Sequence, residues 1–170
     1  MKFMFSVGCS GSGKSTYYYK NLKDTFSIIE PDLIRKEFGD INDQSRNTDV
    51  YMTAHKRLDE YLKDGKNVYF SATNLSVKSI KGLIDIAKKY TNDITCVIFN
   101  DSANWKLCKS RVVADLKNGV ERSNTLVFRE TEKGKIPLIK EMSKRFIGLI
   151  NNPEFIDLLE EKGVKTVNIE

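Results

Sequence analysis

The stretch from Gly8 to Thr16, GCSGSGKST, constrains this chain more than any other. It matches the pattern G-x-x-x-x-G-K-S/T, in which glycines let successive backbone N–H groups turn toward bound phosphates. The apolar segment KFMFSV precedes it, and a segment with helical spacing over residues 14–22 follows it, which is the context that the motif requires. The sequence therefore predicts a phosphate-binding loop (P-loop) between a buried strand and a helix.

The P-loop predicts that the protein uses ATP and Mg²⁺. We expect its nine residues to surround the nucleotide: Gly8, Cys9, Ser10, Gly11, Ser12, Gly13, Lys14, Ser15 and Thr16. Lys14 is expected to reach the β- and γ-phosphates of ATP, and Ser15 to place its hydroxyl on Mg²⁺. GTPases, motor ATPases, nucleotide sensors and kinases all use such a loop, so it does not identify an acceptor.

Strand-like segments alternate with helical ones along the chain. The strand candidates are KFMFSV, FSIIE, NVYFSA, ITCVIF and VKTVNI, and helical spacing covers about 14–22, 47–63, 77–90 and 103–116. This alternation predicts right-handed crossovers and a mostly parallel sheet with both faces covered. The predicted fold class is α/β, a three-layer sandwich around a five-stranded sheet in one domain over residues 1–170. The chain after about residue 125 is predicted to be mainly helical before its closing strand.

Composition is that of an ordinary soluble protein, with 40% hydrophobic and 30% charged residues. No apolar run approaches the roughly 18 residues that span a bilayer, and no signal-peptide layout follows the first strand. We therefore expect no membrane partner and a cytoplasmic location, in the host cell if a phage encodes the chain.

Three cysteines without metal-ligand spacing are expected to be reduced thiols. A net charge of +5 would suit a polyanionic partner without demonstrating one.

Asp32 and Arg35 follow the second predicted strand and lie one helical turn apart. Parallel α/β sheets bind ligands beyond the carboxyl ends of their strands, where these side chains are expected. A carboxylate there can take the proton of an attacking hydroxyl, and an arginine can bind a substrate phosphate. An exposed helix ion pair, worth about 0.2–0.5 kcal/mol, explains the same spacing. The two residues alone leave both interpretations open.

The ordered motifs GCSGSGKST, DLIRKEFGD and SATNL resemble the 5′-hydroxyl polynucleotide kinases of the P-loop type, especially the phage enzymes. The resemblance covers about residues 2–130 and depends on the combination of the three motifs. It implies that Asp32 is the general base for a 5′-hydroxyl and that Arg35 contacts a phosphate of the acceptor strand. It also places Thr73 and Asn74 in the substrate site, although these residue types often cap a following helix.

The third motif departs from the family's pattern. Members of the family usually carry an aspartate beside the Thr–Asn pair, whereas this chain has Ser71 and Ala72. Such an acid would hold a magnesium-bound water or organise the site. Ser71 could hold that water, but a neutral hydroxyl is a weaker ligand, so the expected metal site lacks its acid.

The helix and loop at about residues 104–130 resemble the basic lid of these kinases, which closes over the donor. Arg111 is the first candidate to stabilise charge on the transferring phosphoryl group, with Lys117 and Arg122 behind it. A solvated helix face explains each of these cations equally well. The phosphatase domain that often accompanies phage polynucleotide kinases is not expected in 170 residues.

The sequence thus predicts an ATP- and Mg²⁺-dependent kinase that phosphorylates a 5′-hydroxyl of DNA or RNA, with Lys14, Asp32, Arg35 and Arg111 in catalytic roles. A kinase of a small hydroxylated metabolite, a nucleoside or a modified DNA base is the second interpretation, because nothing reads the acceptor directly. A nucleotide-binding regulator without catalysis is the third. The missing acid favours that regulator, while the intact Lys14, Ser15, Asp32 and Arg35 oppose it. The partner is then a nucleic acid 5′ end or a small molecule, and subunit number stays open.

Overall fold

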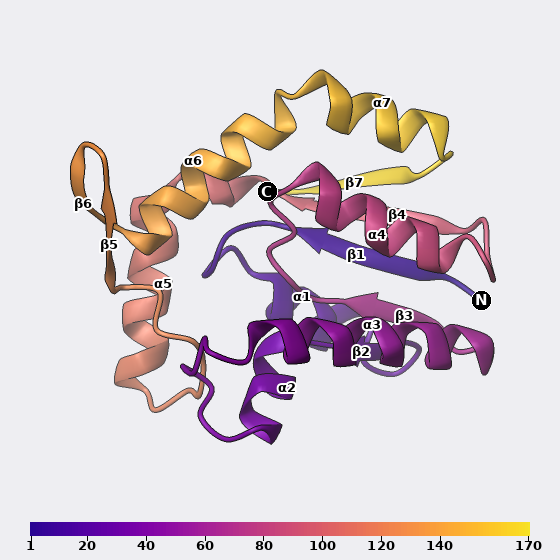
Figure 1. The fold of residues 1–170 in the computed structure, drawn as a ribbon, viewed down its shortest axis with the longest axis horizontal. Coiled ribbons are helices and arrows are strands. Elements are labelled where there is room, and N and C mark those ends of the chain that lie inside the picture. The colour runs from indigo at the N-terminus through magenta and orange to yellow at the C-terminus, as the bar shows by residue number, and fades with distance from the viewer.

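The computed structural model describes residues 1–170 and contains a main sheet with helices on both faces (Figure 1). The strands are β1 (Phe3–Val7), β2 (Ser27–Ile29), β3 (Val68–Phe70), β4 (Ile94–Phe99), β5 (Phe128–Thr131), β6 (Gly134–Pro137) and β7 (Lys165–Ile169). The helices are α1 (Lys14–Asn21), α2 (Pro31–Glu37), α3 (Asn47–Lys63), α4 (Val77–Ala87), the 3₁₀ turn η1 (Asn100–Ala103), α5 (Trp105–Lys117), α6 (Leu138–Ile150) and α7 (Pro153–Glu161).

The main sheet has the strand order β2-β3-β1-β4-β7, and every neighbouring pair is parallel. All five predicted strands belong to it, so the predicted α/β fold is confirmed. Parallel strands end at one edge of the sheet, and this edge gathers the segments that follow β1, β2, β3 and β4. Those segments contain the P-loop and the start of α2.

The two faces of the sheet bury unequal cores. A cluster of 26 buried residues joins one face to α3, α4, α6 and α7, whereas a cluster of five joins the other face to α1. Residues Val50, Ala54, Leu58 and Leu62 of α3 recur at helical spacing and are all fully buried. The larger core fixes the strands, and the smaller one fixes the helix that follows the P-loop.

The hairpin β5–β6 is the main departure from the expected structure, because this part of the chain was predicted to be mainly helical. All four residues of β5 are exposed, so no apolar alternation marks them as a strand. Gly134 at the turn has φ 107, a conformation that glycine adopts without a Cβ clash. The hairpin projects from the body of the fold beside α5 and α6 (Figure 1).

Two expectations from composition can be compared with the structure. Cys9, Cys96 and Cys108 are buried and free, as expected for reduced thiols. None of the helices combines the length and the apolar character needed to cross a membrane.

Candidate active site

The P-loop runs from the end of β1 to the first turn of α1. Gly13 precedes the helix with φ 102, and no side chain caps the first turn. The N–H groups at this helix end are therefore free of side-chain acceptors and carry the partial positive charge of the helix dipole. This is the arrangement that binds phosphates at helix N-termini.

Gly11 lets the P-loop pack beneath α5. Its φ is +78, and a Cβ at this position would lie 2.4 Å from the carbonyl oxygen of Cys108. We expect Gly11→Ala to lower the free energy of unfolding by about 1–3 kcal/mol and to weaken nucleotide binding, because backbone strain and a collision coincide. Chemical denaturation of both proteins, with and without ADP, measures these effects.

Gly82→Ala is the matched control for that substitution. Gly82 lies within α4, where an added Cβ meets nothing within 4 Å. Alanine there should stabilise the protein by about 0.5–1 kcal/mol, because it costs less backbone entropy in a helix. Equal effects of the two substitutions would contradict the packing of the P-loop against α5.

Lys14 and Ser15 open α1 and point to different groups. The Lys14 ammonium donates to the carbonyl oxygens of Gly8 at 3.2 Å and Cys9 at 2.7 Å, so it lies over the loop. Burial lowers the pKa of Lys14 from its ordinary value. The Ser15 hydroxyl donates to Glu30 Oε1 at 2.8 Å, and burial raises the pKa of Glu30. Glu30 was not among the predicted site residues, although its position directly after β2 could have indicated it.

The donors around Ser15 fit a magnesium ion. The protein offers there the Ser15 hydroxyl and the Glu30 carboxylate. The Ser71 hydroxyl, which follows the neighbouring strand β3, is buried without a hydrogen-bond partner. All are oxygen donors, as Mg²⁺ prefers. No three His, Cys, Asp or Glu side chains gather as a metal-binding group. A metal here would thus depend on nucleotide phosphates and water for its other ligands, as Mg²⁺ commonly does.

Asp32 and Arg35 form an ion pair that is not an ordinary surface pair. Arg35 Nη1 lies 2.6 Å from Asp32 Oδ1; the Arg35 side chain is 6% exposed and that of Asp32 is 42% exposed. Arg35 Nη2 donates to Asn47 Oδ1 of α3 at 2.8 Å, and its buried Nε has no partner. The arginine is therefore fixed between two helices and holds an accessible carboxylate in place.

The connecting segment, residues 118–127 between α5 and β5, reaches the P-loop. Arg122 Nη2 donates to Ser10 Oγ at 2.7 Å, and the Thr125 hydroxyl contacts the same oxygen at 3.0 Å. Arg122 also forms an ion pair with Asp115 at the end of α5. These contacts place a guanidinium group directly beside the expected phosphate site.

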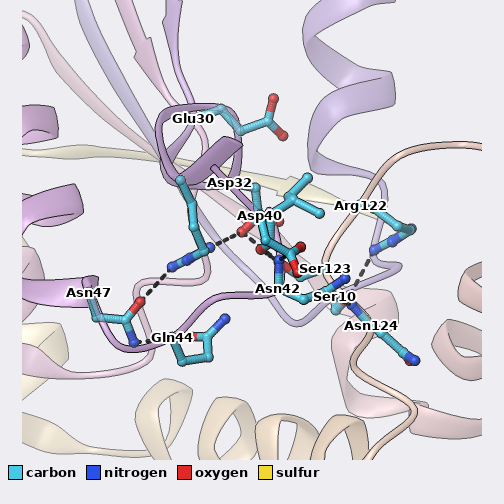
Figure 2. A network of polar contacts seen from close by, with 12 residues as sticks. Ser10, Glu30, Asp32, Asp40, Asn42, Gln44, Asn47, Arg122, Ser123 and Asn124 are labelled. Carbon is cyan, nitrogen blue, oxygen red and sulfur yellow. Dashed lines mark hydrogen bonds and ion pairs between the residues drawn. The ribbon is translucent and has the colours of Figure 1, made fainter. Parts of the chain in front are cut away.

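The same segment also reaches Asp32. The Ser123 hydroxyl donates to Asp32 Oδ1 at 2.8 Å, and the Asn124 N–H donates to Asn42 Oδ1 at 2.8 Å (Figure 2). Asp32 thus already accepts a hydrogen bond from an alcohol. The connecting segment joins the P-loop to this carboxylate, although neither contact was visible in the sequence.

The other lid candidates differ in position. Arg111 of α5 donates to the carbonyl oxygen of Gly11 at 3.2 Å and pairs with Asp101 at 2.8 Å. Lys117 is exposed at the end of α5 and makes no ion pair. Arg111 and Arg122 therefore both touch the P-loop, whereas Lys117 does not.

Thr73 and Asn74 lie between β3 and α4 and contact β1 and the P-loop. The Thr73 carbonyl accepts from the Gly8 N–H at 3.1 Å, and Asn74 Nδ2 donates to the Ser6 carbonyl at 2.8 Å. Asn74 is buried, with φ 47. The cap of α4 is Ser76, so the alternative that Thr73 and Asn74 cap this helix is wrong. Through these two hydrogen bonds, Thr73 and Asn74 fix the backbone at the start of the P-loop.

Comparisons with known proteins agree with this fold. A family model described as an AAA domain matches residues 4–127, well over half of the chain. A chain of the Pnkp1/Rnl/Hen1 RNA repair complex has 20% identity and a TM-score of 0.66, covering 94% of this chain and 45% of that one. This chain therefore spans less than half of the matched chain's length. No curated protein sequence gives a significant match.

Two further similar structures are metabolite kinases by their names. A gluconokinase from Sinorhizobium meliloti 1021 has 16% identity and a TM-score of 0.52, covering 99% of this chain and 82% of that one. A shikimate kinase from Acinetobacter baumannii in complex with shikimate has 15% identity and a TM-score of 0.53, covering 100% and 83%. At these identities the likeness concerns the fold. The chain belongs to the AAA-domain family and has the P-loop fold of the kinase type.

Proposed function

We propose that the protein is an ATP-dependent kinase that transfers the γ-phosphoryl group to a 5′-hydroxyl of a polynucleotide. The observation that carries the proposal is Asp32, an accessible carboxylate that Arg35 holds and that the connecting segment joins to the P-loop. Phosphorylation of an alcohol requires at least a base for the hydroxyl proton and a nearby site for the phosphates of ATP, here the P-loop.

Each part of the site has a task in this reaction. The loop N–H groups and Lys14 hold the phosphates of ATP, while Asp32 takes the proton of the attacking hydroxyl. The oxygens of Ser15 and Glu30 would hold a magnesium ion, which would supply charge neutralisation on the donor. Arg122 and Arg111 both contact the P-loop, and we assign to them the stabilisation of charge on the transferring group. The protein thus acts mainly by positioning and charge neutralisation.

Two observations favour different acceptors. The higher TM-score to a chain of an RNA repair complex and the net charge of +5 support a polynucleotide. The gluconokinase and shikimate kinase are covered over more than four fifths of their length, which supports a small hydroxylated metabolite as the second candidate. Both candidates use the same base and the same P-loop.

A panel of acceptors tests the proposal. Label transfer from γ-labelled ATP is compared for 5′-hydroxyl DNA and RNA oligonucleotides, nucleosides, modified DNA and sugars such as gluconate. The expected product is a 5′-phosphorylated oligonucleotide. Labelling of small molecules alone would replace the polynucleotide by the second candidate. ATP binding with neither transfer nor hydrolysis would indicate a regulator without catalysis.

Ser123 should compete with the acceptor, because its hydroxyl occupies a hydrogen-bonding position on Asp32. We expect Ser123→Ala to lower the KM for the acceptor by about 2- to 10-fold, the worth of one ordinary hydrogen bond, with little change in the KM for ATP. Steady-state kinetics measures both constants. Ser110→Ala is the control, because this exposed serine of α5 bonds only to its own helix. A raised acceptor KM in the Ser123 variant would instead indicate that the hydroxyl helps to bind the acceptor.

A further inference from the structure

Glu30 is a half-buried carboxylate without a cationic partner. It lies between the end of β2 and the first residue of α2, and its Oε1 accepts the hydroxyl proton of Ser15 at 2.8 Å. No lysine or arginine forms an ion pair with it, and the nearby Lys14 ammonium is bonded to backbone carbonyls instead. A carboxylate removed from water ordinarily needs a cation or a metal.

The neighbouring strand adds a second group without a partner. Ile29 of β2 pairs with Phe70 of β3, and the Ser71 N–H donates to the Ile29 carbonyl at 2.8 Å. Ser71 therefore lies directly beside Glu30, where the alternation of the strands directs both side chains to one face. Ser71 is 3% exposed and its hydroxyl makes no hydrogen bond. A buried polar atom of this kind calls for a water or an ion.

Glu30 serves a different purpose from Asp32, although only Pro31 separates them. Figure 2 shows the Glu30 carboxylate directed away from the contact between Asp32 and Ser123. One carboxylate faces the connecting segment and the other faces the first turn of α1. The two acids are thus placed for two separate tasks.

We infer that Glu30 is the acidic group of the magnesium site. The end of β3 offers no carboxylate, because Ser71 and Ala72 follow it, whereas Glu30 at the end of β2 accepts the hydroxyl proton of Ser15. Ser15, Glu30 and Ser71 then form one oxygen-lined edge of a site that the nucleotide phosphates complete. The inference rests on the proposed function only in requiring ATP with Mg²⁺.

The inference predicts that loss of the Glu30 charge weakens nucleotide binding only when the metal is present. The Glu30 carboxylate repels the phosphates when no metal is bound, because both carry negative charge. With Mg²⁺ present the same carboxylate attracts the metal–nucleotide complex. A purely structural role for Glu30 would weaken nucleotide binding in both conditions.

Calorimetric titration of the whole protein with a non-hydrolysable ATP analogue tests this directly, once in Mg²⁺ and once in EDTA. For Glu30→Gln we expect binding about 10- to 100-fold weaker than wild type in Mg²⁺, the usual loss when a metal's supporting group is removed. Binding in EDTA should be unchanged or tighter. Glu37→Gln is the control, because this exposed glutamate pairs with Arg57 at the far end of α2.

The outcomes separate this inference from the proposed function. Equal gains from Mg²⁺ in wild type and Glu30→Gln would overturn the inference, and so would an equal loss of binding in Mg²⁺ and in EDTA. The titration needs no acceptor, so a failure of the acceptor panel leaves its result intact. Conversely, label transfer to oligonucleotides with an unchanged Mg²⁺ effect would keep the proposed function and remove Glu30 from the metal site.

Discussion

Replacing Asp32 with asparagine should lower turnover by about 10²- to 10⁴-fold, the usual loss when a general base is removed. The amide keeps the shape of the side chain and an oxygen toward Arg35, but it cannot take the proton of the acceptor hydroxyl. The affinity for ATP should change little, because the P-loop and Lys14 hold the phosphates. Single-turnover kinetics with a saturating acceptor measures the chemical step, and titration with ADP measures nucleotide binding.

Asp85→Asn is the control for this substitution. Asp85 lies on α4 and is half exposed in an ion pair with Lys81, away from the P-loop. Its loss should leave turnover within about twofold of wild type, as expected for a surface pair. Wild-type turnover in Asp32→Asn would remove Asp32 from the reaction, and a loss of ADP binding would show that its role is structural.

The fold was largely predictable because its buried strands appear in the sequence as short runs of apolar residues. The segments FMFSV and ITCVIF are short, almost continuous apolar runs, as expected for strands covered on both faces. The hairpin β5–β6 has no such apolar run, because every side chain of its first strand is exposed. Where packing does not select the residues, hydrophobic periodicity carries no information.

The site was predictable only where its residues are neighbours in sequence. Lys14 and Ser15 belong to one local motif, and Asp32 and Arg35 lie on one helical turn. Ser123 contacts Asp32 from 91 positions away, and no local spacing marks such a pair. Glu30 lies close to Asp32 in sequence. Its hydrogen-bond partner Ser15, however, belongs to α1, which follows a different strand of the sheet.

Replacing Arg122 with alanine should lower turnover by about 10³-fold or more, the scale of cationic fingers in phosphoryl transfer. Its side chain is 21% exposed, compared with 41% for Arg111, and water screens the less exposed charge less. Arg122 contacts Ser10 of the P-loop, and the next residue, Ser123, contacts Asp32, so this part of the connecting segment touches both the P-loop and the proposed base. Arg111 reaches only the loop carbonyl of Gly11 and Asp101.

We therefore expect Arg122→Ala to lose more turnover than Arg111→Ala, although the sequence alone put Arg111 first. The control is Arg129→Ala, because this exposed arginine of the hairpin pairs only with Glu141 at 3.4 Å. Measuring kcat at saturating ATP and acceptor removes differences in binding from the comparison. A larger loss in Arg111→Ala would assign the charge-stabilising role to α5. Equal, small losses in both would mean that the P-loop and the metal neutralise the transferring group without an arginine.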